Sequence, residues 1–179
     1  MDLIVSRDQD GIWRAAFDGR VWRCAVGPGG VSSNKREGDG ATPAGGFALR
    51  RVLYRPDRLA RPETGLPVTA LRPEDGWCDD PDDAAYNRPV RLPYAASHER
   101  LWRDDGIYDV IVVLGHNDDP PVPGRGSAVF LHVARPDYGP TAGCVALALP
   151  DLREVLRQAD TSSRVCVEAP ATSAPAAPG

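Results

Sequence analysis

Short apolar runs separated by turn residues dominate the first part of the chain. Three of these runs are rich in β-forming residues, and Asp18-Gly19 between the second and third is the two-residue turn typical of a hairpin. The pattern therefore predicts a meander of strands at residues 3–6, 12–17 and 21–26.

Five later runs also have the length and composition of strands. They lie at residues 47–54, 108–114, 127–133, 144–149 and 164–168. A single amphipathic helix is predicted from Pro150 onward, with Asp151 as its N-cap and Glu154 as the capping-box partner. The chain is therefore expected to be mainly β, with one helix in its C-terminal region, folded as a single domain over residues 1–168.

The remaining segments are irregular. The loop at residues 27–47 is rich in Gly and charge, and residues 55–100 contain seven prolines, so this second segment is expected to cover one face of the sheet and shape a pocket or lid. Residues 97–103 are expected to form a short helical turn. The Ala/Pro/Ser tail at residues 169–179 is predicted to be disordered.

Composition narrows the class of protein. The 179 residues suit one domain with a real core, and a net charge of -4 with a pI near 5.4 excludes the basic footprint of a nucleic-acid-binding protein. No signal peptide and no membrane-spanning stretch is recognisable in the chain as given, so we expect a cytoplasmic protein, or a periplasmic or envelope one if the sequence has been trimmed.

The candidate chemistry lies in residues 130–147, FLHVARPDYGPTAGCVAL. His132 ends one apolar run and Cys144 begins the next, so neighbouring strands are expected to bring both side chains to the same rim of the sheet. A histidine that takes the thiol proton turns cysteine into a nucleophile. The alternative is a core cysteine beside a structural histidine. Gly143 favours the active-site interpretation, because it lets a substrate carbonyl approach backbone N–H groups, and Thr141 adds a hydroxyl.

Four segments together resemble the YkuD-type L,D-transpeptidase catalytic domain. They are KREGDGATPAG at residues 35–45, YNR at 86–88, GSAVFLH at 126–132 and TAGCV at 141–145. The resemblance spans about residues 21–167 and implies a β-sandwich-like mixed sheet. It also implies an enzyme whose cysteine attacks the third residue of a peptidoglycan stem peptide, commonly diaminopimelate, expels the terminal D-alanine and holds a thioester.

By this resemblance, Cys144 is the nucleophile and His132 the general base, and the N–H groups of Gly143 and Cys144 form the oxyanion hole. The chain departs from the family pattern at two positions. Ala142 stands where a histidine is usual, and Ala146 where an arginine is usual. The spacing from the histidine to the cysteine is also shorter.

Since that arginine is absent, another cation should hold the substrate carboxylates. Arg125 is the first candidate, followed by Arg135 and Arg88, although each is equally well an exposed arginine without a role. His116 is a rival base or a wall of the pocket, and Trp77 is the tryptophan expected to touch substrate. Since no second His or Cys stands at ligand spacing, no metal and no other cofactor is predicted.

The thioester has two fates. Attack by water makes the enzyme an L,D-carboxypeptidase, and attack by a second stem peptide makes a cross-link. Without a signal peptide the enzyme would meet free muropeptides, so we favour hydrolysis in cell-wall recycling, with the cross-linking L,D-transpeptidase as the alternative. An inactive peptidoglycan-binding module is the alternative of another class. The expected partner is a stem peptide or muropeptide, without nucleic acid or membrane insertion, and the oligomeric state is left open.

Overall fold

The structure is a computed structural model that describes residues 1–170, so the predicted disordered tail lies outside the described residues except for its first two positions. The described part is mostly β with a single helix, as predicted. The strands are β1 (Asp2–Arg7), β2 (Trp13–Phe17), β3 (Arg20–Ala25), β4 (Val31–Ser32), β5 (Thr42–Pro43), β6 (Gly45–Tyr54), β7 (Val68–Ala70), β8 (Asp75–Cys78), β9 (Pro89–Arg91), β10 (His98–Arg100), β11 (Val110–Leu114), β12 (Phe130–Val133), β13 (Val145–Leu147) and β14 (Arg164–Val167). The helix is α1 (Leu149–Gln158).

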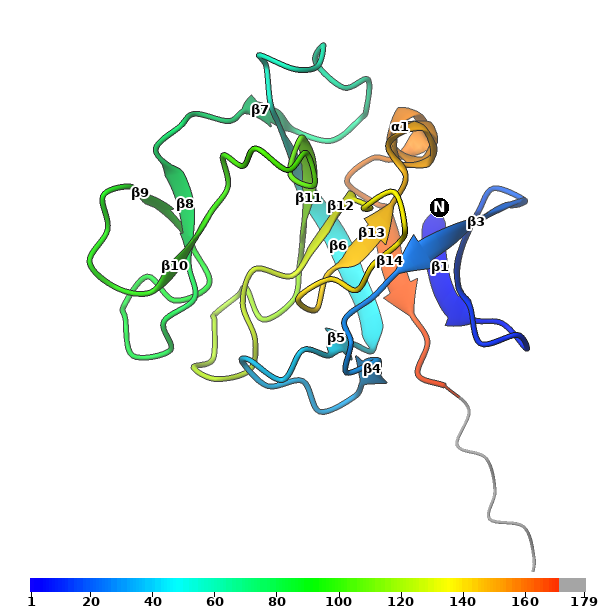
Figure 1. Cartoon of the computed structure of the whole chain (residues 1–179), viewed down its shortest axis with the longest axis horizontal. Coiled ribbons are helices and arrows are strands. Elements are labelled where there is room, and N and C mark those ends of the chain that lie inside the picture. Colours follow the sequence, from blue (N-terminus) through cyan, green and yellow to red (C-terminus); the bar gives the residue numbers. More distant parts are fainter. Residues whose placement is uncertain (171–179) are drawn as a thin grey trace, which may run out of the picture.

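The largest sheet closes on itself. Its strand order is β11-β12-β13-β3-β2-β1-β14-β6-β7, and β6 also pairs with β11. The first part of β6, residues 45–48, pairs with β14, and the second part, residues 49–54, pairs with β11. The long strand β6 therefore closes the ring between β14 and β11, with β7 as an additional strand at its edge, and it crosses the middle of the molecule (Figure 1).

Alternation along the strands divides the apolar side chains between two clusters. The interior core includes Leu131 and Val145, and α1 packs Leu152, Val155 and Leu156 into it. The second, outer cluster lies on the opposite face of β6, β11 and β12. It consists of Leu53, Leu71, Trp77, Leu101, Tyr108, Ile111, Val113, Ala128, Phe130 and Cys144. Because successive strand residues point to opposite faces, the nucleophile candidate stands outside the closed sheet.

A small sheet covers this outer cluster. It has the order β10-β8-β9 and lies beside the main sheet, on the side away from β1 and β3 (Figure 1). Residues 55–100 were expected to be an irregular cover, and the structure gives them these short strands. The helical turn expected at residues 97–103 is wrong, because His98–Arg100 pairs with β8 and satisfies its backbone groups across strands.

The sequence predicted the hairpin turn correctly and the start of the helix incorrectly. Asp18 and Gly19 have φ of 47° and 74°, as a two-residue hairpin turn of this kind requires. The helix begins one residue before Pro150, with Ala148 as its N-cap and no side-chain cap, so Asp151 is a first-turn acid and not the cap. Proline favours the first turn because its φ is already helical.

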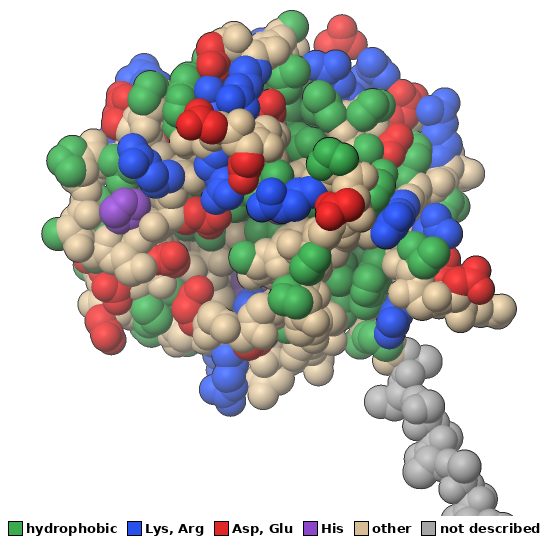
Figure 2. Space-filling model, in the orientation of Figure 1, with side chains coloured by type: hydrophobic (Ala, Val, Ile, Leu, Met, Phe, Trp, Pro, Cys, Tyr) green, Lys and Arg blue, Asp and Glu red, His purple; other side chains and the backbone are tan. Residues whose placement is uncertain are grey.

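The four cysteines all lie in the described part of the chain and are free. Within residues 1–170 no helix has the length and apolar character needed to cross a bilayer. Acidic and basic side chains are interspersed over the face that Figure 2 shows, in keeping with the mixed charge of the sequence.

Candidate active site

His132 and Cys144 stand on the same face of two neighbouring strands. The strands β12 and β13 are parallel, with Leu131 opposite Val145 and His132 opposite Ala146. Cys144, just before β13, therefore lies beside Phe130 and two residues along from His132. Both side chains were expected at one rim of the sheet, and this was wrong in detail. The strands β12 and β13 are parallel, so the C-terminal end of β12 lies beside the C-terminal end of β13 and not beside its start. The Cα atoms of the pair are roughly 7–8 Å apart, within reach of both side chains.

The Cys144 thiol is enclosed, with 4% of the residue exposed. Its Sγ donates to the Ala128 carbonyl at 3.3 Å and accepts from the Phe130 N–H at 3.4 Å. Burial raises the pKa of the thiol to about 12, Glu99 adds to the rise, and the Phe130 N–H and Lys35 oppose it. The resting Cys144 thiol is therefore neutral at pH 7.

His132 is equally buried and is also neutral. Its Nδ1 lies 2.9 Å from the Val133 carbonyl, an oxygen that can only accept, so Nδ1 carries the proton and Nε2 is the free base. Burial lowers the pKa of the imidazole to about 4, against the Val133 hydrogen bond. The Tyr108 ring packs edge-on against it, with centroids 5.3 Å apart. A backbone carbonyl thus selects the tautomer that a general base needs.

The turn before Cys144 is fixed by hydroxyl groups. Thr141 Oγ1 donates to the Cys144 carbonyl at 2.7 Å and accepts from the Gly143 N–H at 3.1 Å. Thr42 Oγ1 donates to the same carbonyl at 3.2 Å. Thr141 therefore holds the turn in this state, and the Gly143 N–H must exchange this bond before it can serve an oxyanion.

Gly143 cannot be replaced without strain. Its φ is 122°, in the region that favours glycine, and a Cβ there would lie 2.9 Å from the Ala41 carbonyl oxygen and 3.6 Å from Lys35 Nζ. The glycine therefore allows the residue 35–45 loop to pack directly against the cysteine turn.

Lys35 is the residue of this loop whose importance the sequence did not reveal. Its side chain is only 8% exposed and pairs with Asp39, while Nζ donates to the Arg36 carbonyl at 2.9 Å. These bonds order the loop. Its ammonium group also lies against Gly143 and lowers the pKa of the Cys144 thiol. The Lys35 ammonium group thus adjoins the turn that precedes Cys144.

Glu99 and Tyr108 form a second unforeseen part of the surroundings. The Tyr108 hydroxyl donates to Glu99, and burial raises the pKa of both groups. The negative charge of Glu99 opposes ionisation of Cys144. Burial is the main reason that the pKa of the Cys144 thiol is raised, and Glu99 adds to it. No motif in the sequence marked Glu99 or Tyr108.

The predicted substrate-binding residues fall into separate places. Arg125 and His116 line one cavity of about 510 Å³, where His116 Nε2 lies 3.0 Å from the Arg125 carbonyl. Lys35 lines the same cavity, so it adjoins the Gly143 turn. Arg135 stands apart, 3.6 Å from Asp105, and its charge contributes to the lowered pKa of His132.

Trp77 and Arg88 line a different cavity, of about 400 Å³, which Phe130 also lines. Trp77 is buried, packs edge-on against Phe130 with centroids 5.2 Å apart, and donates its indole N–H to Asn87. Trp77 belongs to the same apolar cluster as Cys144. Within the described residues, no group of three or more His, Cys, Asp or Glu side chains could hold a metal ion.

The arrangement can support nucleophilic acyl transfer. An enclosed thiol, an imidazole with its free nitrogen available, a glycine turn and a buried ammonium group occupy adjacent positions on one face. A family model described as the L,D-transpeptidase catalytic domain, YkuD, matches residues 3–167. This match confirms the resemblance and extends it to the first strand. Neither the curated proteins nor the solved structures include a significant match.

Proposed function

Because the chain belongs to the YkuD family of L,D-transpeptidase catalytic domains, whose activity is directed at peptidoglycan, we propose that it cleaves D-alanine from stem tetrapeptides as an L,D-carboxypeptidase. Cys144 is the nucleophile, His132 the general base, and water the acceptor. The observation that carries the proposal is the placement of Cys144 and His132 on one face of adjacent strands, with the His132 tautomer that leaves Nε2 free.

The first step starts from two neutral groups. With the pKa of the thiol near 12 and that of the imidazole near 4, a thiolate–imidazolium pair is not the resting form. The proton therefore moves from Sγ to His132 Nε2 as Sγ attacks the substrate carbonyl. Before that, the S–H must leave the Ala128 carbonyl, to which it donates at rest.

Negative charge then develops on the carbonyl oxygen. The N–H groups of Gly143 and Cys144 are its donors, once Gly143 has released Thr141 Oγ1. Lys35 supports the same charge from behind Gly143, since its ammonium group is buried and held by Asp39. A cation with little solvent around it acts more strongly than one in water.

Collapse of this intermediate breaks the peptide bond. The imidazolium gives its proton to the departing D-alanine amine and leaves a thioester on Cys144. His132 then takes a proton from water, the hydroxide adds to the thioester carbonyl, and Sγ leaves and is reprotonated. The products are D-alanine and the tripeptide, and the enzyme returns to its neutral pair.

Enclosure of Sγ favours water as the acceptor. Cys144 lines neither the 400 Å³ nor the 510 Å³ cavity, and a water molecule needs far less additional opening than a second stem peptide. One observation favours the alternative, cross-linking: two separate cavities lie near Cys144, one lined by Phe130 and the other by Lys35, and a donor and an acceptor peptide would require two such spaces.

The test is incubation of the purified full chain with defined tripeptide, tetrapeptide and pentapeptide muropeptides, followed by mass spectrometry. Conversion of tetrapeptide to tripeptide supports hydrolysis, and Cys144→Ala, with folding checked by circular dichroism, should abolish it. Dimers as the only products would establish cross-linking. Binding of tetrapeptide without any product would instead identify an inactive peptidoglycan-binding module.

A further inference from the structure

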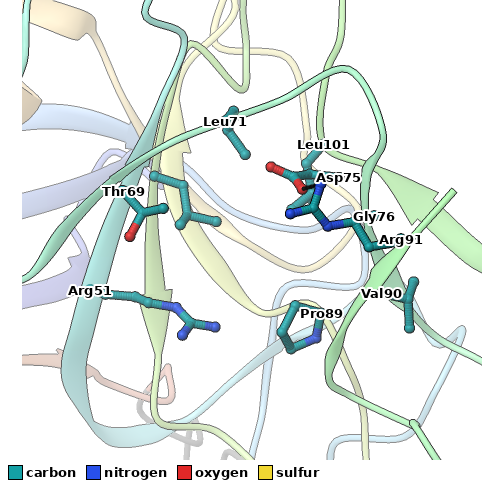
Figure 3. A pocket seen from close by; sticks show the side chains of 10 residues that line it. Arg51, Thr69, Leu71, Asp75, Gly76, Pro89, Val90, Arg91 and Leu101 are labelled. Carbon is teal, nitrogen blue, oxygen red and sulfur yellow. Dashed lines mark ion pairs between the residues drawn. The ribbon is translucent and has the colours of Figure 1, made fainter.

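Two neighbouring cavities lie between the main sheet and the small sheet. The first, of about 390 Å³, and the second, of about 400 Å³, are both lined by Arg51 of β6 and Pro89 of β9. Figure 3 shows the first: the Arg51 side chain reaches from β6 toward Pro89, and Asp75 and Arg91 pair on the opposite side. Because both cavities border on Arg51, we call them together the Arg51 groove.

Arg51 differs from Arg50 and Arg91 in the same groove. Arg91 is bound by Glu74 at 2.7 Å, and Arg50 by Asp118 at 2.8 Å. Among the described residues, the side chains of Arg51 and Arg88 have no ion pair and no hydrogen bond, and Nε of Arg51 is buried without a partner. An unpaired buried N–H of a charged group costs free energy that a suitable ligand recovers. The planar guanidinium is suited to a carboxylate.

The charge of the groove agrees with an anionic ligand. Its second cavity is lined by the cations Arg50, Arg51 and Arg88 and by the single carboxylate Asp118. The chain as a whole carries a net charge of -4. This cavity is therefore more positive than the protein as a whole. Because the cavity is recessed, the electrostatic field of its arginines acts more strongly on a ligand.

Strand register connects this groove with the nucleophile. Arg51 lies opposite Val113, Val113 opposite Phe130, and Phe130 beside Cys144, all on the outer face. Three strand spacings of about 4.8 Å place the Cα atoms of Arg51 and Cys144 about 14 Å apart. A peptide advances about 3.4 Å per residue, so a carboxylate one or two residues from an acyl group on Sγ lies within reach of the Arg51 side chain.

We propose that Arg51 is the carboxylate-binding residue of the acyl-donor subsite, which takes the part of the stem peptide that remains on Cys144. This inference rests on the proposed function. Two free carboxylates of a stem peptide lie at a suitable distance: that on the side chain of the diaminopimelate residue and the α-carboxylate of the preceding γ-linked D-glutamate. Arg51 thus supplies a cation in place of the usual family arginine, whose position is occupied by Ala146 in this chain.

The experiment separates binding from turnover. Cys144→Ala protein is titrated calorimetrically with the parent tetrapeptide, a peptide with lysine in place of diaminopimelate, and a peptide with D-isoglutamine in place of D-glutamate. Arg51→Gln in this background should weaken binding of the parent at least about tenfold, the loss expected for one charge-assisted contact. It should not weaken binding of the peptide that lacks the contacted carboxylate, which identifies the source.

Controls keep the result tied to the carboxylate. Arg51→Lys should recover part of the affinity, and Arg157→Gln on the exposed face of α1 should leave it within about twofold of the parent protein. Equal parent affinity with and without Arg51→Gln overturns the proposal, as does absence of parent binding in a folded protein. D-alanine release by the Cys144 enzyme is measured separately, so loss of the proposed activity and loss of the Arg51 contact are distinct outcomes.

Discussion

Burial of a neutral His132 should make the fold sensitive to mild acid. The pKa of this imidazole is lowered from its ordinary value of 6.5 to about 4, chiefly by burial. As the pH falls below 6.5, the unfolded chain takes up a proton on this histidine and the folded chain does not, so stability is lost. At about 1.4 kcal/mol for each pKa unit, the loss is about 2 kcal/mol at pH 5 and about 3 kcal/mol at pH 4.

The matched variant is His132→Asn. Its side-chain amide can still donate to the Val133 carbonyl, as Nδ1 does, but it has no titrating group. Urea unfolding of both proteins at pH 7, 6, 5 and 4 gives the free energy of unfolding of each. Other groups titrate in both proteins and largely cancel, so the stability advantage of the wild type should shrink by about 2 kcal/mol between pH 7 and pH 5.

The reasoning is refuted if the stability advantage of the wild type over His132→Asn changes by less than 0.5 kcal/mol (roughly the error of such extrapolations) between pH 7 and pH 5. Such a result would mean that His132 is solvated or already protonated in the folded protein. The proposed general base would then have a different acid limit, and the neutral resting pair would have to be abandoned.

Three further outcomes follow from the surroundings of the cysteine. Lys35→Met should lower kcat/KM for D-alanine release by about tenfold or more, since a cation beside the developing oxyanion is lost, and circular dichroism checks that the variant is folded. Gly143→Ala should reduce the free energy of unfolding by about 1–3 kcal/mol in urea, because its Cβ would press on the Ala41 carbonyl at a strained φ. Iodoacetamide at pH 8 should label half-exposed Cys166 before Cys144, whose burial raises its pKa to about 12; peptide mapping that finds Cys144 first would contradict this.

The main strands were predictable because each carries its own signal. Residues 110–114 are continuously apolar, and both faces of β11 are buried, one in the interior core and one in the outer cluster. The strands β8, β9 and β10 were not predictable, because segments of three or four residues without an alternating apolar pattern acquire strand structure only from partners elsewhere in the chain. His98–Arg100 is extended because β8 is there to pair with it.

The candidate pair His132 and Cys144 could be singled out from the sequence for a similar reason, but its geometry could not. His132 and Cys144 are marked by local motifs, but their offset depends on the parallel pairing of β12 with β13, a non-local choice. Lys35 and Arg51 went unrecognised because their importance comes from what packs against them. The importance of Lys35 depends on its contact with Gly143, and that of Arg51 depends on its unpaired, buried Nε in a groove.

The closed pairing order has a consequence for synthesis. β14 lies between β1 and β6, so the ring of strands cannot close until residues 164–167 have left the ribosome. Until then the nascent chain presents β1 and part of β6 as open edges, the kind of surface that pairs with other chains. These late, long-range contacts make slow folding expected. The strand β14 contains no site residue, but it must pair with β1 and β6 before the strands next to His132 and Cys144 belong to a closed sheet.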